Sequence, residues 1–152
     1  MRLQNLLLIG LTGLAFSASA CGHKAKPDTT VAASDKKLFD RLGGLDAIKA
    51  VVDDFAANVL ADDLVNATFK GVDPVHFKQM MVDQVCNATG GPCEYKGKDM
   101  KTAHTGMKIT EAQFNAVVGD LVKSLDKFKV PAKEKGELLA ALGGMKDQIV
   151  GQ

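Results

Sequence analysis

Aromatic residues are scarce in this chain, which has no tryptophan, one tyrosine and seven phenylalanines among 152 residues. A chain with so few aromatic side chains offers no platform on which bases could stack. The formal net charge is only +1, so the chain also lacks the basic excess that draws proteins to phosphate backbones. These two absences argue against nucleic acid as the main partner. The hydrophobic content of 46% is ample for a packed core, and the length fits one domain with an N-terminal extension.

Motifs typical of enzymes are also absent. A pass along the sequence finds no Gly-rich phosphate loop, no paired catalytic carboxylates and no nucleophile–histidine arrangement. The glycine pairs stand where helical patterns end, at Gly43-Gly44, Gly90-Gly91 and Gly143-Gly144. The sequence therefore carries no catalytic centre that a motif could identify.

The first 20 residues have the anatomy of a secretory signal peptide. A basic start at Arg2 is followed by an apolar run from Leu6 to Ala18 and by small residues up to Ala20. The run is too short for a comfortable membrane span. We therefore predict export, with a periplasmic location for the mature protein.

Cys21, directly after these small residues, resembles the lipidated first residue of a bacterial lipoprotein. Such boxes usually carry leucine where this chain has Ala18, so ordinary cleavage after Ala20 stays an alternative. We expect contact with a membrane only through such a lipid anchor. Residues 21–35 are small, polar and without period, and are predicted to form a flexible tether to a folded domain at 36–152.

The domain is predicted to be all-α, because apolar residues recur at helical spacing and no alternating strand pattern is seen. A helix over residues 45–61 is followed by one that starts at Asp73-Pro74, with Asp as N-cap and Pro at the first helical position. Thr110 and Gln113 form a capping box at the start of a third long helix. The residues expected to face inward are Phe77, Met80, Met81, Val85 and Ala88 on the second helix, Phe114, Val117, Leu121, Leu125 and Phe128 on the third, and Leu138, Leu142, Met145 and Ile149 on a last helix after Val130-Pro131.

One histidine stands among apolar residues at helical spacing. Met100 lies four residues before His104, so the two side chains share one face of a short helix predicted over residues 99–105. An imidazole placed in this way can direct one ring nitrogen at a metal ion in an apolar pocket. The alternative is a core histidine that bonds a backbone carbonyl, and this stretch alone favours the alternative.

A series of short motifs runs through the helical domain in a fixed order. They are Leu42-Gly43-Gly44, Val52-Asp53-Asp54-Phe55, Val59-Leu60-Ala61-Asp62, Phe69-Lys70-Gly71, Gly90-Gly91-Pro92, Tyr95-Lys96-Gly97, Met100 to His104, Ile109-Thr110, Phe114 and Val130-Pro131. Each motif is weak alone, but the order and spacing over residues 38–150 resemble those of the group I truncated haemoglobins, which are small haem-binding globins. The resemblance implies a two-over-two helical sandwich that holds haem b with its iron and binds a diatomic gas, such as oxygen, nitric oxide or carbon monoxide.

The resemblance also implies roles for individual residues. The family's proximal iron ligand falls on His104. Tyr95 would lie near a haem propionate. Lys98 and Lys101 are candidate propionate partners through charge-assisted hydrogen bonds, and the alternative of an ordinary solvated surface position is favoured for both. The residues that would wall the haem are Phe55, Phe69, Met100, Ile109, Phe114, Val117 and Leu121.

The distal side departs from the family pattern. Many relatives carry Tyr where this chain has Ala56, and Gln or His where it has Phe77 and Met81. Met80 occupies a place where some relatives supply a sixth iron ligand. The distal side has three interpretations. It is an apolar pocket that binds gases without a hydrogen-bond donor, or its methionines only fill the core. The third interpretation, iron coordination by the Met80 thioether, ranks behind these two. His76 is expected at the rim of the haem.

The leading hypothesis is therefore a globin that reversibly binds oxygen or another diatomic gas. An enzyme of the same fold, acting on nitric oxide or peroxide, is less favoured because such reactions usually need a distal proton donor. Electron transfer through a haem held by His104 and Met80 is a further alternative, as is a haem-free helical lipoprotein. A reductase would be an additional partner, which the sequence does not identify.

Cys86 and Cys93 remain in the domain after export. An exported protein meets an oxidising compartment, so a disulfide between them is the natural expectation. A redox-active dithiol and free thiols stay as alternatives.

Overall fold

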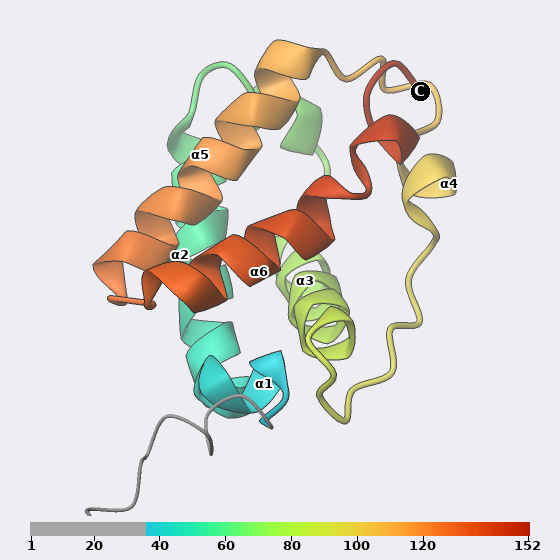
Figure 1. Ribbon diagram of the computed structural model, residues 1–152. Coiled ribbons are helices and arrows are strands. Elements are labelled where there is room, and N and C mark those ends of the chain that lie inside the picture. The colour runs from blue at the N-terminus through green and yellow to red at the C-terminus, as the bar shows by residue number, and fades with distance from the viewer. Residues whose placement is uncertain (1–35) are drawn as a thin grey trace, which may run out of the picture.

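A computed structural model describes residues 36–152, and the predicted signal peptide and tether lie outside the described residues (Figure 1). The described chain is helical, as predicted, and apart from an isolated bridge between Ile109 and Val150 it contains no β-structure. The elements are α1 Leu38–Arg41, α2 Gly44–Ala61, η1 Asn66–Phe69, α3 Pro74–Ala88, α4 Met100–His104, α5 Glu111–Lys127, α6 Ala132–Gly143 and η2 Lys146–Gln148, where η marks a 3₁₀-helix.

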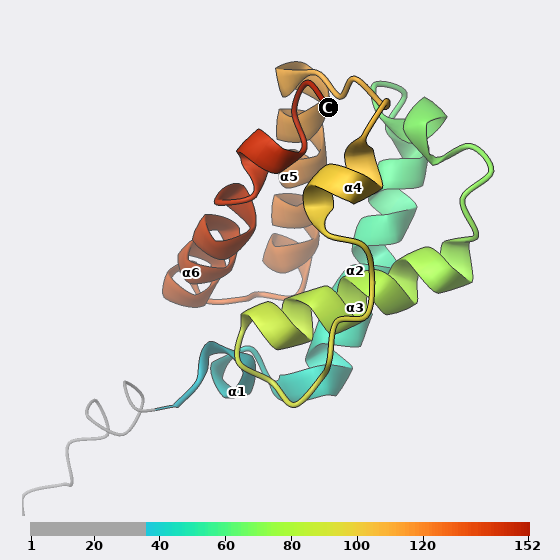
Figure 2. The ribbon, with the colours of Figure 1, turned by 90° about the vertical axis from the view of Figure 1, so that its right-hand side faces the viewer.

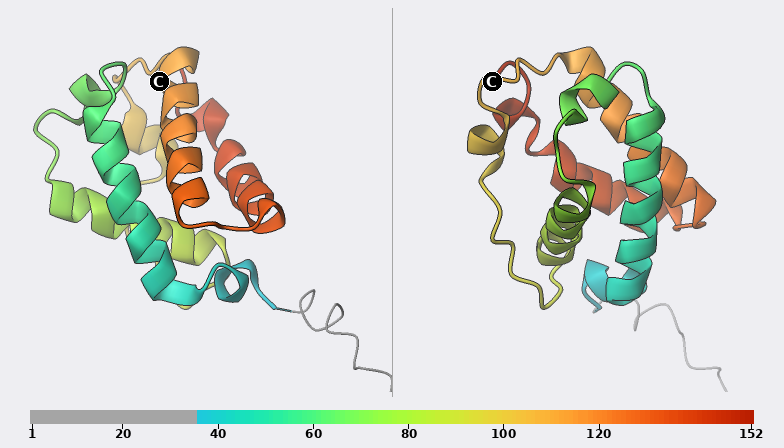
Figure 3. Two further views of the ribbon diagram at one scale, coloured as in Figure 1. Left: turned by 90° about the vertical axis from the view of Figure 1, so that its left-hand side faces the viewer. Right: turned by 180° about the vertical axis from the view of Figure 1, so that it is seen from behind.

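The long helices form two pairs. α2 packs against α3, which crosses it, and α5 turns back into α6 (Figure 2). α2 also packs along α5, and this contact joins the two pairs (Figure 3). α4 is short and stands beside η2, away from the α2–α5 contact. This arrangement leaves α3 and α4 facing each other across the interior of the domain.

The core lies where the two pairs meet. Its buried members are mostly β-branched or leucine side chains that recur at helical spacing on α2, α3 and α5, as the sequence pattern predicts. Val59 and Leu125 are among the most completely buried. The buried apolar residues of this core are Ile48, Val51, Val52, Phe55, Val59, Val65, Val82, Val85, Leu121, Leu125 and Leu138.

Local capping fixes where the helices start. The Asp73 carboxylate accepts a hydrogen bond from the Val75 backbone N–H at 2.9 Å, and Pro74 holds the first helical position of α3. At α5 the Gln113 N–H donates to Thr110 Oγ1 at 3.2 Å, while the Thr110 N–H donates to Gln113 Oε1 at 2.9 Å. Both predicted caps are therefore confirmed.

Two expectations about inward-facing residues need correction. Ala88 is exposed, because it lies off the face of α3 that is buried at this end of the helix, where Cys86 and Thr89 face the core. Phe128 is 43% exposed, because it caps the C-terminus of α5 instead of continuing its buried face.

The last helix is also shorter than predicted. α6 ends at the Gly143-Gly144 pair, so Met145 and Ile149 lie beyond it, yet both are half-buried and line the interior as expected.

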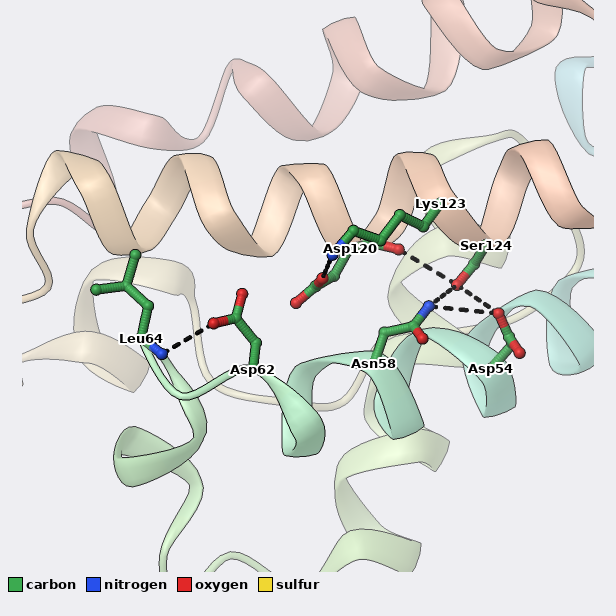
Figure 4. Close-up of polar contacts among 7 residues, drawn as sticks. All are labelled: Asp54, Asn58, Asp62, Leu64, Asp120, Lys123 and Ser124. Carbon is green, nitrogen blue, oxygen red and sulfur yellow. Dashed lines mark hydrogen bonds and ion pairs between the residues drawn. The ribbon is translucent and has the colours of Figure 1, made fainter.

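A polar cluster lies between α2 and α5 (Figure 4). The buried Ser124 hydroxyl donates to Asp54 Oδ2 at 2.9 Å and accepts from Asn58 Nδ2 at 2.9 Å. Nearby, Asp120 is only 1% exposed; its Oδ1 accepts from Lys123 Nζ at 2.8 Å, and its Oδ2 has no hydrogen-bond partner among the described residues. The Asp54 cluster fixes the register of α2 against α5, since each donor there has a specific acceptor.

A disulfide joins Cys86, near the end of α3, to Cys93 in the following loop, as expected, with 5.7 Å between the two Cα atoms.

Among the helices of residues 36–152, none is long and apolar enough to cross a membrane.

Candidate functional site

A largely apolar cavity of about 580 Å³ lies between α3 and α4 and extends to α5 and α6. This volume falls within the range of roughly 300–1,000 Å³ that is typical of sites for small molecules and cofactors. The structure brings together around it every residue that the resemblance assigns to a haem site except Lys101. Those lining residues are Phe55, Phe69, Phe77, Met80, Met81, Tyr95, Lys98, Met100, His104, Ile109, Phe114, Val117 and Leu121.

Lys101 does not line the cavity. It is exposed and follows Met100 directly on α4, and one helical position turns a side chain by about 100° away from its neighbour. Met100 and His104, one turn apart, share the face that lines the cavity. The structure therefore places Lys101 outside the lining of the cavity, and its pairing with a haem propionate stays a prediction.

His104 is the one half-buried imidazole at the cavity. Its Nδ1 lies 2.7 Å from the backbone carbonyl oxygen of Met100. Because a carbonyl can only accept, Nδ1 carries a proton, and in the neutral ring this leaves the lone pair on Nε2. The two interpretations of this histidine are thus compatible: the bond to a backbone carbonyl is present, and it leaves Nε2 as the nitrogen that could ligate a metal.

The chain around His104 explains why a short helix forms here. Asp99 caps α4 by accepting a hydrogen bond from the Thr102 N–H at 2.9 Å. The side-chain and backbone hydrogen bonds of Thr102 lower the pKa of Asp99 below its ordinary value. The helix ends after His104, and Gly106 adopts a φ of 83°, which favours glycine.

The α3 side of the cavity is apolar where the family pattern is often polar. Phe77, Met80 and Met81 line it, and the Phe69 and Phe77 rings meet edge to face with centroids 5.1 Å apart. Ala56, on α2, is buried and brings no donor. All five methionines of the described chain line the same cavity, at positions 80, 81, 100, 107 and 145. His76 also lines it and is exposed, so it stands at the rim as expected.

Gln84 is a polar lining residue that the sequence reasoning missed. Its Nε2 lies 3.3 Å from Met100 Sδ and 3.5 Å from Met145 Sδ. The available signal was its position three residues after Met81 and seven after Phe77, which places it on the same face of α3. Other lining residues outside the prediction include Thr68, Met107 and Gln113.

Tyr95 and Lys98 form a polar corner of the lining. The Tyr95 hydroxyl donates to the Lys98 backbone oxygen at 2.8 Å. Partial burial, and then the negative charge of Asp99, raise the pKa of Tyr95 above its ordinary value. Gly97 passes so close to the Tyr95 ring that a Cβ at this position would force the ring to shift.

Comparison with known proteins agrees with this geometry. Residues 37–150 match the sequence pattern of the family described as bacterial-like globin. The chain belongs to this family. It is 34% identical over 117 residues to the group 1 truncated hemoglobin GlbN of Mycolicibacterium paratuberculosis, a match that covers 77% of this chain and 86% of that protein.

Solved structures show the same architecture. The truncated hemoglobin of Tetrahymena pyriformis in its Fe(III) form superposes with a TM-score of 0.75 at 32% identity, covering 77% of this chain and all of that one (100%). The 2/2 hemoglobin of Synechococcus sp. PCC 7002 gives a TM-score of 0.69 at 29% identity, covering 74% and 95%. The predicted two-over-two truncated globin fold is thereby confirmed.

Membership of the globin family implies haem with its iron as the cofactor. The residues present fit this group. The cavity offers a wide apolar lining for a flat hydrophobic ring, and His104, whose Nδ1 is engaged by the Met100 carbonyl, offers Nε2 as an iron ligand. Within residues 36–152 no group of three or more His, Cys, Asp or Glu side chains forms a metal site.

Proposed function

We propose that this globin binds haem b through Nε2 of His104 and reversibly binds oxygen or another diatomic gas in its apolar cavity. The observation that carries the proposal is the 2.7 Å hydrogen bond from His104 Nδ1 to the Met100 carbonyl, made at the wall of a 580 Å³ cavity. That bond fixes both the tautomer and the orientation of the ring. The haem iron supplies the site at which the gas is held.

The chain's own residues exclude water and hold the cofactor in place. Phe55 is buried, and Phe69 and Phe77 pack against each other, so the α2–α3 side of the cavity is closed by rings. Lys98, at the polar corner, is the one lysine or arginine of residues 36–152 that lines the cavity, and its ammonium would pair with a haem carboxylate. Gas affinity in such a pocket is set by access and by apolar contact, because Phe77 and Met81 carry no hydrogen-bond donor.

The test is an absorption spectrum of the haem-loaded protein, in ferric and ferrous states and with carbon monoxide, beside the same spectra of His104→Ala. We expect the variant to lose its proximal coordination, which would appear as a changed Soret band and faster haem loss. A wild-type protein that takes up no haem, or a variant with an unchanged spectrum, would contradict the proposal. Tyr95→Phe serves as a control, since it alters the lining but no nitrogen ligand.

A second candidate is electron transfer, in which Met80 and His104 would both hold the haem iron. The observation that favours it is the position of the half-buried Met80 thioether, which lines the same cavity as His104. A His/Met pair raises the reduction potential of a haem. In that case the ferrous protein would be low-spin without added ligand, and Met80→Leu would convert it to high-spin.

An enzymatic role in nitric oxide or peroxide removal is less well supported by the lining. Thr68 donates its hydroxyl to the Val65 carbonyl at 2.7 Å, and the Gln84 amide donates to two methionine sulfurs. These cavity donors are therefore already engaged within the protein. Nitric oxide consumption by the oxygenated protein, with and without an added reductase, would measure this activity directly.

We further propose that the protein is exported and that Cys21 carries the lipid anchor. The disulfide between Cys86 and Cys93 supports an oxidising compartment. Fractionation of cells that express the full chain, beside a Cys21→Ala variant, would test it. The wild type is expected in the membrane fraction and the variant in the soluble periplasm.

A further inference from the structure

The helix that carries His104 has few fixed points of its own. α4 is five residues long, and none of its residues is buried. A helix of this length is not stable in water by itself. Beyond the cap at Asp99, its orientation must therefore be set by contacts with the rest of the domain.

Gln84 makes such a contact from α3, on the opposite side of the cavity. Its Nε2 lies 3.3 Å from Met100 Sδ and 3.5 Å from Met145 Sδ. The amide nitrogen has two protons, so each sulfur can accept one. Thioether sulfur is a weak acceptor but is polarizable, and no other acceptor among the described residues bonds this nitrogen.

Met100 connects this contact to the imidazole. While its sulfur accepts from Gln84, its backbone carbonyl oxygen lies 2.7 Å from His104 Nδ1. A displacement of Met100 therefore moves the acceptor that orients the ring. Gln84 has no hydrogen bond to His104 itself, so any influence that it has on the ring runs through Met100.

We propose that Gln84 is a positioning residue for the iron ligand. Its hydrogen bond from α3 to Met100 fixes the carbonyl that holds the His104 imidazole in orientation. The hydrogen bond thereby links two walls of the cavity, because Gln84 lies on α3 and Met100 lies on α4 with His104. This inference rests on the proposed role of His104.

Resonance Raman spectroscopy of the haem-loaded, ferrous full chain tests the proposal through the iron–histidine stretching band. That band responds to the tilt and strength of the bond to the imidazole, which a general loss of stability does not change. Gln84→Leu is expected to shift or broaden it. The rate of haem loss should rise on the order of five-fold, as expected for one net hydrogen bond.

The matched control is Gln79→Leu. Gln79 lies on the same helix, is exposed, and donates to Asp83 Oδ1 at 3.0 Å, so its loss removes a hydrogen bond without touching α4. The Gln79→Leu variant should keep the iron–histidine band at the wild-type position. Met100→Leu removes the sulfur but keeps the carbonyl, and in this background Gln84→Leu should have no further effect.

Two results would overturn the inference. The first is an iron–histidine band in Gln84→Leu that is identical to the wild-type band. The second is that Gln84→Leu shifts this band in the Met100→Leu background as much as it does in the wild type. A failure of the proposed role of His104 would give a different spectroscopic result. In that case the wild type itself shows no iron–histidine band, or His104→Ala retains it.

Discussion

Cys86 and Cys93 form a disulfide that ties the end of α3 to the loop leading toward α4. Cys86 is fully buried in the core, whereas Cys93 is partly exposed. The bond therefore anchors the loop to the buried core. It also shortens the free chain between the two helices that face the cavity.

Reduction of this disulfide should lower the stability of the domain. For a closed loop of about eight residues the chain-entropy estimate is roughly 2.5 kcal/mol of unfolding free energy. Urea unfolding with and without a dithiol reductant would measure the loss. A Cys86→Ala/Cys93→Ala variant is the control, because the reductant should leave its unfolding curve unchanged.

Truncation of Leu125 should be among the most damaging changes in the core. The side chain is 1% exposed, at the contact of α5 with the α2–α3 pair. Leu125→Ala is expected to cost about 3 kcal/mol, from lost burial and the cavity left behind. Leu60→Ala is the matched control on α2, where the leucine is 51% exposed, and should cost less than about 1 kcal/mol. Equal losses in the two variants would contradict the burial pattern described above.

Stability should fall in acid because two carboxylates are held ionised in the folded protein. Hydrogen bonds from Lys127 and then Ser124 lower the pKa of Asp54 below its ordinary value of 3.8. The hydrogen bond from Arg41 lowers the pKa of Glu137 below its ordinary 4.5. A group with a lowered folded pKa stabilises the fold above its unfolded pKa, and this stabilisation is lost as the pH falls through the folded pKa.

The unfolding free energy should therefore decrease as the pH falls below about 4.5. Asp54→Asn should flatten that decrease, because the variant has no proton to take up at this position. Asp147→Asn is the control, since Asp147 is exposed and its carboxylate forms no ion pair with the described residues. Denaturant titrations at a series of pH values between about 6 and 3 would provide the curves.

A hydrogen-bond donor introduced on the α3 side should slow gas release. Met81 lines the cavity, and Met81→Gln replaces a thioether by an amide of similar length. One added hydrogen bond to a polar ligand is worth about 1 kcal/mol, so oxygen should leave roughly five-fold more slowly. Met107→Gln is the matched control, because Met107 lines the cavity where it is 41% exposed. Stopped-flow displacement of oxygen by carbon monoxide would compare the two rates, and an unchanged rate in Met81→Gln would contradict the expected direction.

Much of the fold followed from local patterns. The helix predicted over 45–61 is α2, and the capping residues Asp73, Thr110 and Gln113 take the places expected of them. Caps and helical periods involve residues within one or two turns of each other, so a sequence displays them directly. The same is true of Met100 and His104, one turn apart on α4.

Exposure at the helix ends and contacts between distant residues could not be predicted from local sequence patterns. Ala88 and Phe128 carry apolar side chains at a helical spacing, yet both are exposed, because Ala88 lies off the buried face of α3 and Phe128 follows the end of α5. Gln84 has no unusual neighbour in the sequence, and its contact with Met145 joins residues 61 positions apart. The exposure of a residue and its long-range contacts depend on where the neighbouring helices end and how they pack.

The amino-acid order alone determined the helical character of this protein, the starts of its main helices and the histidine set among apolar residues, since each is fixed by interactions within a few residues. Only the folded arrangement decided that Gln84 reaches across to Met100 and that the thioethers of five methionines gather around one cavity. Those facts depend on the packing of helices distant in the chain, whose mutual position is set by core burial and not by local spacing.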